Sequence, residues 1–189
     1  AGPGISGVNL RKLVQATHAA PPTQSRPVDL LLGGLATRLT DGYAAGAPLL
    51  KRALRALRGP NQPGEEALLW LHFASATASH VWDDQTWHAT ATRHVRLARE
   101  VGAFAMLAHA LNMAIGMHAS MGDLALAASL ADEKEALTDA TGIAIMSYGT
   151  PLLAAWQGRE TEAESIFEAI GQEVLGRAEG LGIKIIQWA

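Results

Sequence analysis

Hydrophobic side chains recur at intervals of three or four residues along most of the chain. The first such run places Val28, Leu31, Leu35 and Leu39 at this spacing, directly after Pro27. A period near 3.6 residues puts these side chains on one face of an α-helix, and proline suits the first turn, where no amide hydrogen is needed. No segment alternates apolar and polar residues strongly enough to outweigh this pattern. The sequence therefore predicts an all-α fold.

Turns that contain glycine, proline or aspartate divide the chain into helical segments. An irregular lead-in occupies residues 1–26, and a helical-repeat domain occupies residues 27–189. This domain holds four helix pairs and the start of a ninth helix near residue 182. The paired helices are predicted at about residues 27–39, 43–57, 65–82, 84–99, 103–121, 123–138, 143–157 and 161–177.

The two members of a predicted pair differ in their polarity. The first members are apolar nearly all round, as in Leu68–Phe73, whereas the second members carry charge on one side. In the second helix that charge is a run of basic residues, namely Lys51, Arg52, Arg55 and Arg58. A helix that is apolar all round is expected to be buried, so first helices are sandwiched and second helices cover them. Because the net charge is negative, we expect the basic run to be a solvated face, with a nucleic-acid or partner patch as the alternative.

The helix pairs recur at the period of a solenoid. The tetratricopeptide pattern, laid on the chain by its turns, aligns Tyr43, Trp87, Leu124 and Glu160, about 36 to 44 residues apart, against ~34 in the standard repeat. Small residues fall where paired helices approach closely, at Gly34, Ala78, Gly46, Thr90, Ala127 and Ala163. Ile115, Pro151 and Lys134 depart from this rule. We expect a degenerate tetratricopeptide-like, right-handed solenoid of antiparallel helix hairpins.

Composition narrows the classes of function. The absence of cysteine excludes disulfides, zinc–thiolate sites and thiol catalysis, and favours a reducing, cytoplasmic location. A net charge of −3 lacks the basic footprint of direct nucleic-acid binding. No apolar run reaches the roughly 18 residues of a membrane span, and the start lacks the features of a secretory signal. Because residue 1 is not Met and the end stops inside an apolar helical pattern, we expect a fragment of a larger chain.

Several stretches resemble the helical region of actinobacterial LuxR-family large ATP-binding transcriptional regulators. The likeness covers about residues 10 to 189. Its landmarks include Arg26–Leu54, Glu65–Leu68 with Leu71, Trp82-Asp83-Asp84 with Trp87, Arg93–Arg99, Leu152–Glu160, and Gly180-Leu181-Gly182 with Gln187-Trp188-Ala189. The resemblance implies a parent with an N-terminal P-loop ATPase, this helical sensor and a C-terminal helix-turn-helix domain. Neither flanking activity is expected here, since the glycines at positions 2, 4 and 7 lack the lysine of a phosphate-binding loop.

The sequence offers weak grounds for catalysis. Three of its seven histidines, His72, His80 and His88, lie eight residues apart, which is not the spacing of metal ligands on one helix. Asp83 and Asp84 stand where a helix begins, so capping explains them better than acid–base chemistry. We therefore expect a protein that is not an enzyme and needs no cofactor. A helical hydrolase or metal enzyme is a remote alternative.

A binding site is expected on the concave side of the solenoid, which first helices line. Projecting the repeat register onto that side selects His72, Ser75, Ser79, Trp82, His109, Asn112 and Tyr148. Aromatic and convergent polar groups suit a protein or peptide partner or a small-molecule effector. Equally, these groups could satisfy one another or face the ATPase and helix-turn-helix domains of the parent. A second hypothesis is a structural scaffold for homo-oligomerisation without an effector.

Overall fold

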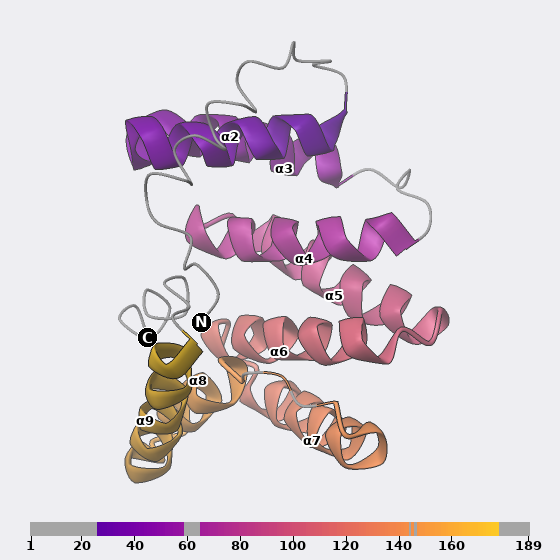
Figure 1. Ribbon diagram of the computed structural model, residues 1–189, viewed down its shortest axis with the longest axis vertical. Helices are drawn as coiled ribbons and strands as arrows, with labels where there is room; N and C mark the ends of the chain where they lie inside the picture. The colour runs from indigo at the N-terminus through magenta and orange to yellow at the C-terminus, as the bar shows by residue number, and fades with distance from the viewer. Residues whose placement is uncertain (1–25, 59–64, 144, 146, 178–189) are drawn as a thin grey trace. The chain divides into compact units, whose positions relative to one another are not determined.

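The computed structural model describes residues 26–58, 65–143, 145 and 147–177 of the chain. Every regular element in these ranges is a helix, so the predicted all-α class is confirmed (Figure 1). The helices are α2 (Pro27–Asp41), α3 (Tyr43–Leu57), α4 (Glu65–His80), α5 (Asp84–Glu100), α6 (Phe104–Ser120), α7 (Leu124–Thr141), α8 (Gly149–Trp156) and α9 (Glu160–Arg177).

The observed helices agree with the predicted ones within a few residues, except for α8. That helix begins at Gly149 rather than near Ile143, because α7 extends to Thr141 and ends at Gly142, whose backbone is left-handed with φ of 70°. Pro151 then occupies the first turn of α8, where its missing amide hydrogen costs nothing. The predicted lead-in and the ninth helix lie almost entirely outside the described residues, which begin at 26 and end at 177.

The chain divides into two compact units, one up to Thr90 and one from Ala91 onward. In the first unit α2 and α3 pack as a close hairpin, and glycine makes that approach possible. A methyl group added at Gly34 would lie 2.7 Å from Cδ2 of Leu50, and one added at Gly46 would lie 2.5 Å from Cβ of Arg38. Both glycines occupy positions at which the tetratricopeptide pattern predicts small residues.

In the second unit α6 is the central helix and packs against both α7 and α8, while α8 also packs against α9. Its side chains are buried on all sides over most of its length, with Leu111, Ile115 and Met117 fully inaccessible. Each buried side chain of this size contributes roughly 1.5 to 3 kcal/mol to folding. This burial matches the expectation that a first helix, apolar all round, is sandwiched.

Four helices end in the same backbone motif. The residue after the helix cap is left-handed, and the next amide donates a hydrogen bond to the carbonyl five residues earlier, which defines a Schellman turn. These bonds run from Asp83 to Ala78, Ala103 to Ala98, Asp123 to His118 and Arg159 to Ala154, at 2.9 to 3.0 Å. The left-handed residues are Trp82, Gly102, Gly122 and Gly158. Only the first of these four carries a side chain.

Candidate functional site

The seven residues predicted to line a groove divide between the two units. His72, Ser75, Ser79 and Trp82 belong to the first unit, whereas His109, Asn112 and Tyr148 belong to the second. Each set is therefore considered within its own unit. Their exposure separates residues that a ligand could reach from residues that hold helices together.

Ser75 is a packing residue. It is fully buried, and its hydroxyl forms a 3.1 Å hydrogen bond with the hydroxyl of Thr90, which joins α4 to α5. Ser79 is half-buried and donates to the carbonyl of Ala76 in its own helix. His72 is half-buried as well, with its ring edge-on to Phe73 at 5.7 Å between ring centres. Among the predicted residues of this unit, Trp82 alone is widely exposed, at 69%.

Asn112 in the second unit is also a packing residue rather than a surface residue. It is only 7% exposed, and its side-chain oxygen accepts a 2.9 Å hydrogen bond from the amide of Gly149. Tyr148 precedes that glycine and is half-buried at the start of α8. His109 is exposed on α6, where partial burial of the ring lowers its pKa below the ordinary 6.5. The structure thus corrects the expectation that Ser75 and Asn112 face a ligand.

A surface hollow of about 440 Å³ lies beside Trp82 in the first unit. One wall comes from α3 and its cap, and the other comes from the turn between α4 and α5. We call it the basic–aromatic hollow. It is lined by Lys51, Arg55, Arg58, Trp82, Asp83, Asp84 and Gln85.

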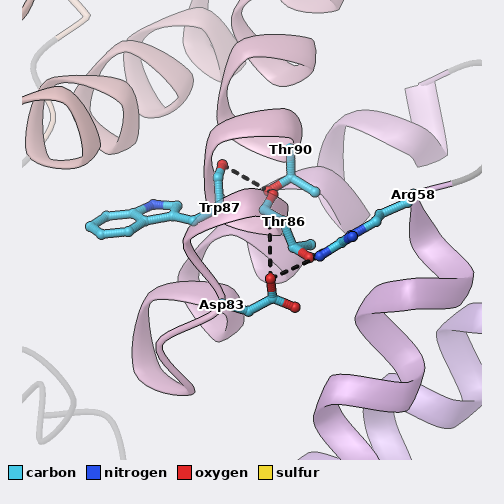
Figure 2. A network of polar contacts seen from close by, with 5 residues as sticks. All are labelled: Arg58, Asp83, Thr86, Trp87 and Thr90. Atoms are coloured by element: carbon cyan, nitrogen blue, oxygen red, sulfur yellow. Dashed lines mark hydrogen bonds and ion pairs between the residues drawn. The ribbon is translucent and has the colours of Figure 1, made fainter. Parts of the chain in front are cut away.

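Asp83 organises one side of this hollow (Figure 2). Its carboxylate caps α5 by accepting the Thr86 amide at 3.1 Å, as the sequence predicted, and accepts Nη2 of Arg58 at 2.8 Å. Nε of Arg58 donates to the Thr86 hydroxyl at 2.7 Å and closes the triangle. Burial alone would raise the pKa of Asp83, but the Thr86 hydrogen bonds and the Arg58 charge outweigh it and lower that pKa. The triangle locks α3 to the α4–α5 turn.

Positive charge remains on the other side of the hollow. Lys51 and Arg55 are exposed, and no carboxylate in the described part of the chain lies within 4.0 Å of either. The sequence of α3 contains no acidic residue, so no intrahelical ion pair is available to them. Lys51 and Arg55 stand four residues apart and therefore on one face of the helix.

Trp82 has an unusual backbone. Its φ of 54° falls in the left-handed region, whereas the equivalent residues of the other three Schellman turns are glycines. A side chain in this region costs roughly 1 to 2 kcal/mol. Bulky residues rarely adopt it, and such strain is more common at functional positions than elsewhere. The strained backbone thus belongs to the most exposed tryptophan in the described part of the chain.

Sequence reasoning selected Trp82 but missed its neighbours from α3. The run Lys51, Arg52, Arg55 and Arg58 was interpreted as a solvated face because the chain as a whole is negatively charged. One feature of the sequence could have indicated a binding role for this run. No acidic residue stands at the i,i+4 positions of the same helix to pair with the basic side chains. The structure brings three of the four basic residues to one hollow and leaves Arg52 outside it.

Other chemistry in the described residues is sparse. No group of three or more His, Asp or Glu side chains there lies close enough to hold a metal ion. A second hollow of about 400 Å³ lies on α8 and α9, next to Phe167 and the carboxylates of Glu160 and Glu164. None of the described helices is both long enough and apolar enough to span a bilayer.

The described part of the chain is thus all-helical and carries these two surface hollows. Comparison with known proteins found no matching family model, no matching curated protein and no matching solved structure.

Proposed function

We propose that this chain is a non-catalytic helical-repeat module that binds a peptide, a protein partner or a small effector. In this proposal it is the sensor or interaction segment of a cytoplasmic LuxR-type ATP-binding transcriptional regulator. The binding signal passes to ATPase and helix-turn-helix domains elsewhere in the parent chain. Such coupling requires that the ligand bind one arrangement of the module more tightly than another.

The recurring Schellman turn is the observation that carries the repeat part of this proposal. The turns at Trp82 and Gly122 lie about 40 residues apart, and each is followed by an aspartate that accepts an amide of the next helix. Helical repeats have periods of roughly 34 to 47 residues. Asp83 and Asp123 thus occupy equivalent places in two successive hairpins, which is the behaviour expected of a repeat.

The close contacts of the first hairpin support the tetratricopeptide register by a separate route. Gly34 and Gly46, which the tetratricopeptide pattern assigns to close-approach positions, are the places in α2 and α3 where an added methyl group would clash. Ala78, Ala127 and Ala163, at the corresponding positions of later helices, are buried. Small buried residues at these places favour a tetratricopeptide-like arrangement of each pair.

Trp82 supports the binding part of the proposal. Tryptophan is enriched among the residues that dominate binding energy at protein interfaces. Here the tryptophan stands on a strained backbone beside Lys51 and Arg55, which have no carboxylate within 4.0 Å among the described residues. A purely structural role does not require any of these features.

The assignment to a regulator is tested by the coding sequence on either side of this segment. We expect a phosphate-binding G-x-x-x-x-G-K-[ST] motif upstream and a helix-turn-helix domain downstream in the same reading frame. A complete gene that encodes neither would overturn the LuxR-type assignment.

The binding function is tested separately with the purified chain. Tryptophan emission is followed during titration with peptides and metabolites, and the wild type is compared with Trp82→Phe. A saturable change that is lost in Trp82→Phe supports binding at the hollow. Self-association in sedimentation experiments, with no ligand response in either protein, would favour the structural scaffold instead.

A further inference from the structure

The basic–aromatic hollow has a chemistry that specifies its occupant. We propose that it docks an acidic peptide segment of a partner protein, with carboxylates on Lys51 and Arg55 and an apolar side chain against the indole of Trp82. This partner class narrows the binding function proposed above and rests on it.

Charge is the first reason for an acidic partner. Lys51 and Arg55 have no carboxylate partner within the described residues, although the whole chain carries a net charge of −3. The Asp83 carboxylate is paired with Arg58 and caps α5 through the Thr86 amide. Asp84 also lines the hollow, at the N-terminus of α5, where the helix dipole stabilises it. A carboxylate arriving from outside gains charge-assisted hydrogen bonds from an ammonium and a guanidinium group.

Trp82 is the reason for an apolar side chain beside those carboxylates. The indole is 69% exposed, so most of its surface is available for burial by a partner. The left-handed backbone at φ 54° presents the side chain from a turn rather than from a helix face. Glycine closes the same turn at three other places, so the architecture does not require tryptophan. Contact with a ligand accounts for a strained, exposed aromatic residue at this position.

The openness of the hollow favours a peptide over a small molecule. Six of its seven lining residues are exposed, and only Asp83 is partly buried. Small-molecule sites cover roughly 70 to 90% of their ligand, which such a shallow surface cannot do. An extended or helical segment instead lies across the hollow and continues beyond it. It gains affinity from one aromatic anchor surrounded by charged contacts.

The test uses the whole chain as bait for random peptides displayed on phage. We expect the selected sequences to be rich in Asp and Glu and to carry an aromatic or large aliphatic residue. A synthetic peptide of the consensus sequence is then titrated against the chain at low and high salt. Its affinity should fall as salt rises, because exposed charge pairs are screened.

Three variants locate the site. In Trp82→Gly the glycine suits the left-handed backbone of the turn, so the fold is kept while the indole is lost. This variant should bind about tenfold more weakly, or less tightly still. Arg55→Glu should also weaken it by about tenfold, since it replaces attraction by repulsion. Arg52→Glu is the matched control, because it makes the same charge change on the same helix outside the hollow. It should leave the affinity within about twofold of the wild type.

Several results would overturn the proposal. These are selection of neutral or basic peptides, no selection at all, equal losses in Arg52→Glu and Arg55→Glu, or no loss in Trp82→Gly. Binding of inorganic phosphate or nucleotide that depends on Arg55 but not on Trp82 would identify a simple anion site and also overturn it. The proposed regulator function fails on different grounds, namely the flanking coding sequence and the broader ligand titration. A failure of peptide docking alone is therefore distinguishable.

Discussion

Asn112 in the middle of α6 accepts a hydrogen bond from the amide of Gly149, the first residue of α8, over 2.9 Å. Both residues are buried, so one side chain fixes where a neighbouring helix begins. The amide of a first helical residue has no acceptor within its own helix, and this bond supplies one. This contact therefore ties the start of α8 to the middle of α6.

Asn112→Ala should destabilise the chain by about 1 to 3 kcal/mol, because it leaves a buried amide without its acceptor. Urea unfolding followed by circular dichroism measures the loss. Ser120→Ala serves as the control, since the Ser120 hydroxyl donates to the carbonyl of Gly116 within its own helix and does not join two helices. A control effect below about 0.5 kcal/mol is expected. Equal midpoints for Asn112→Ala and the wild type would contradict a role for this contact.

Gly149→Ala should also destabilise the chain, by about 1 to 3 kcal/mol, through overpacking. Its methyl group would come within 2.6 Å of the Asn112 carbonyl oxygen and 2.9 Å of Cβ of Ile115. Gly171→Ala is the matched change in α9, where the added methyl group meets no atom within 4 Å. It should stabilise the helix by about 0.5 to 1 kcal/mol. The two midpoints should therefore move in opposite directions, and a shared direction would refute the described packing.

Trp82→Gly should raise the free energy of unfolding by roughly 1 kcal/mol, because glycine adopts the left-handed backbone without strain. The reverse experiment is Gly122→Ala at φ 83°, where the added methyl group meets nothing within 4 Å and only the backbone is strained. It should cost a similar amount. Thermal and urea denaturation of both variants test the pair. If Trp82→Gly is less stable than the wild type, the indole makes contacts that outweigh its backbone strain.

The ion pair of Asp83 should make stability dependent on pH in the acid range. The pKa of Asp83 is lower in the folded chain than its ordinary 3.8, so the ionised carboxylate stabilises the fold at neutral pH. As pH falls below that ordinary value, the unfolded chain binds a proton first. The stabilisation is therefore lost progressively and is gone once the folded carboxylate is protonated.

Asp83→Asn keeps an oxygen that can cap α5 but removes the charge. At neutral pH it should be less stable than the wild type by about 0.5 to 1 kcal/mol, a modest value because Arg58 is 37% exposed. That difference should shrink toward zero as pH falls through the folded pKa. Urea midpoints of both proteins across the acid range provide the measurement. A difference that stays constant with pH would show that the charge of Asp83 contributes nothing.

Helix positions could be predicted because each helix buries a continuous face, and burial leaves a 3.6-residue period in the sequence. The start of α8 could not, because residues between Gly142 and Gly149 are apolar enough to resemble a helix. The end of α7 depends on the left-handed Gly142, and the start of α8 depends on the contact between Gly149 and Asn112. Neither the backbone conformation of Gly142 nor the long-range contact can be read from the spacing of apolar residues.

The candidate site was harder to predict for a related reason. Projecting a repeat register onto a surface treats every inward polar residue as open to a ligand. Ser75 instead meets Thr90, and Asn112 meets Gly149, because small polar groups in tight interfaces pair with one another. Trp82 was selected correctly as exposed, but Lys51 and Arg55 lie some thirty residues earlier. Only the three-dimensional structure brings them to the same hollow.

The Schellman turns have a consequence for how specificity could change in this scaffold. A main-chain hydrogen bond spans each turn, and three of the four turns form with glycine, which has no side chain, at the left-handed position. A substitution at Gly102, Gly122 or Gly158 would therefore leave the flanking helices in place, at a cost of roughly 1 to 2 kcal/mol. Each of these glycines is a position at which one mutation could install a new recognition group, as tryptophan is installed at residue 82.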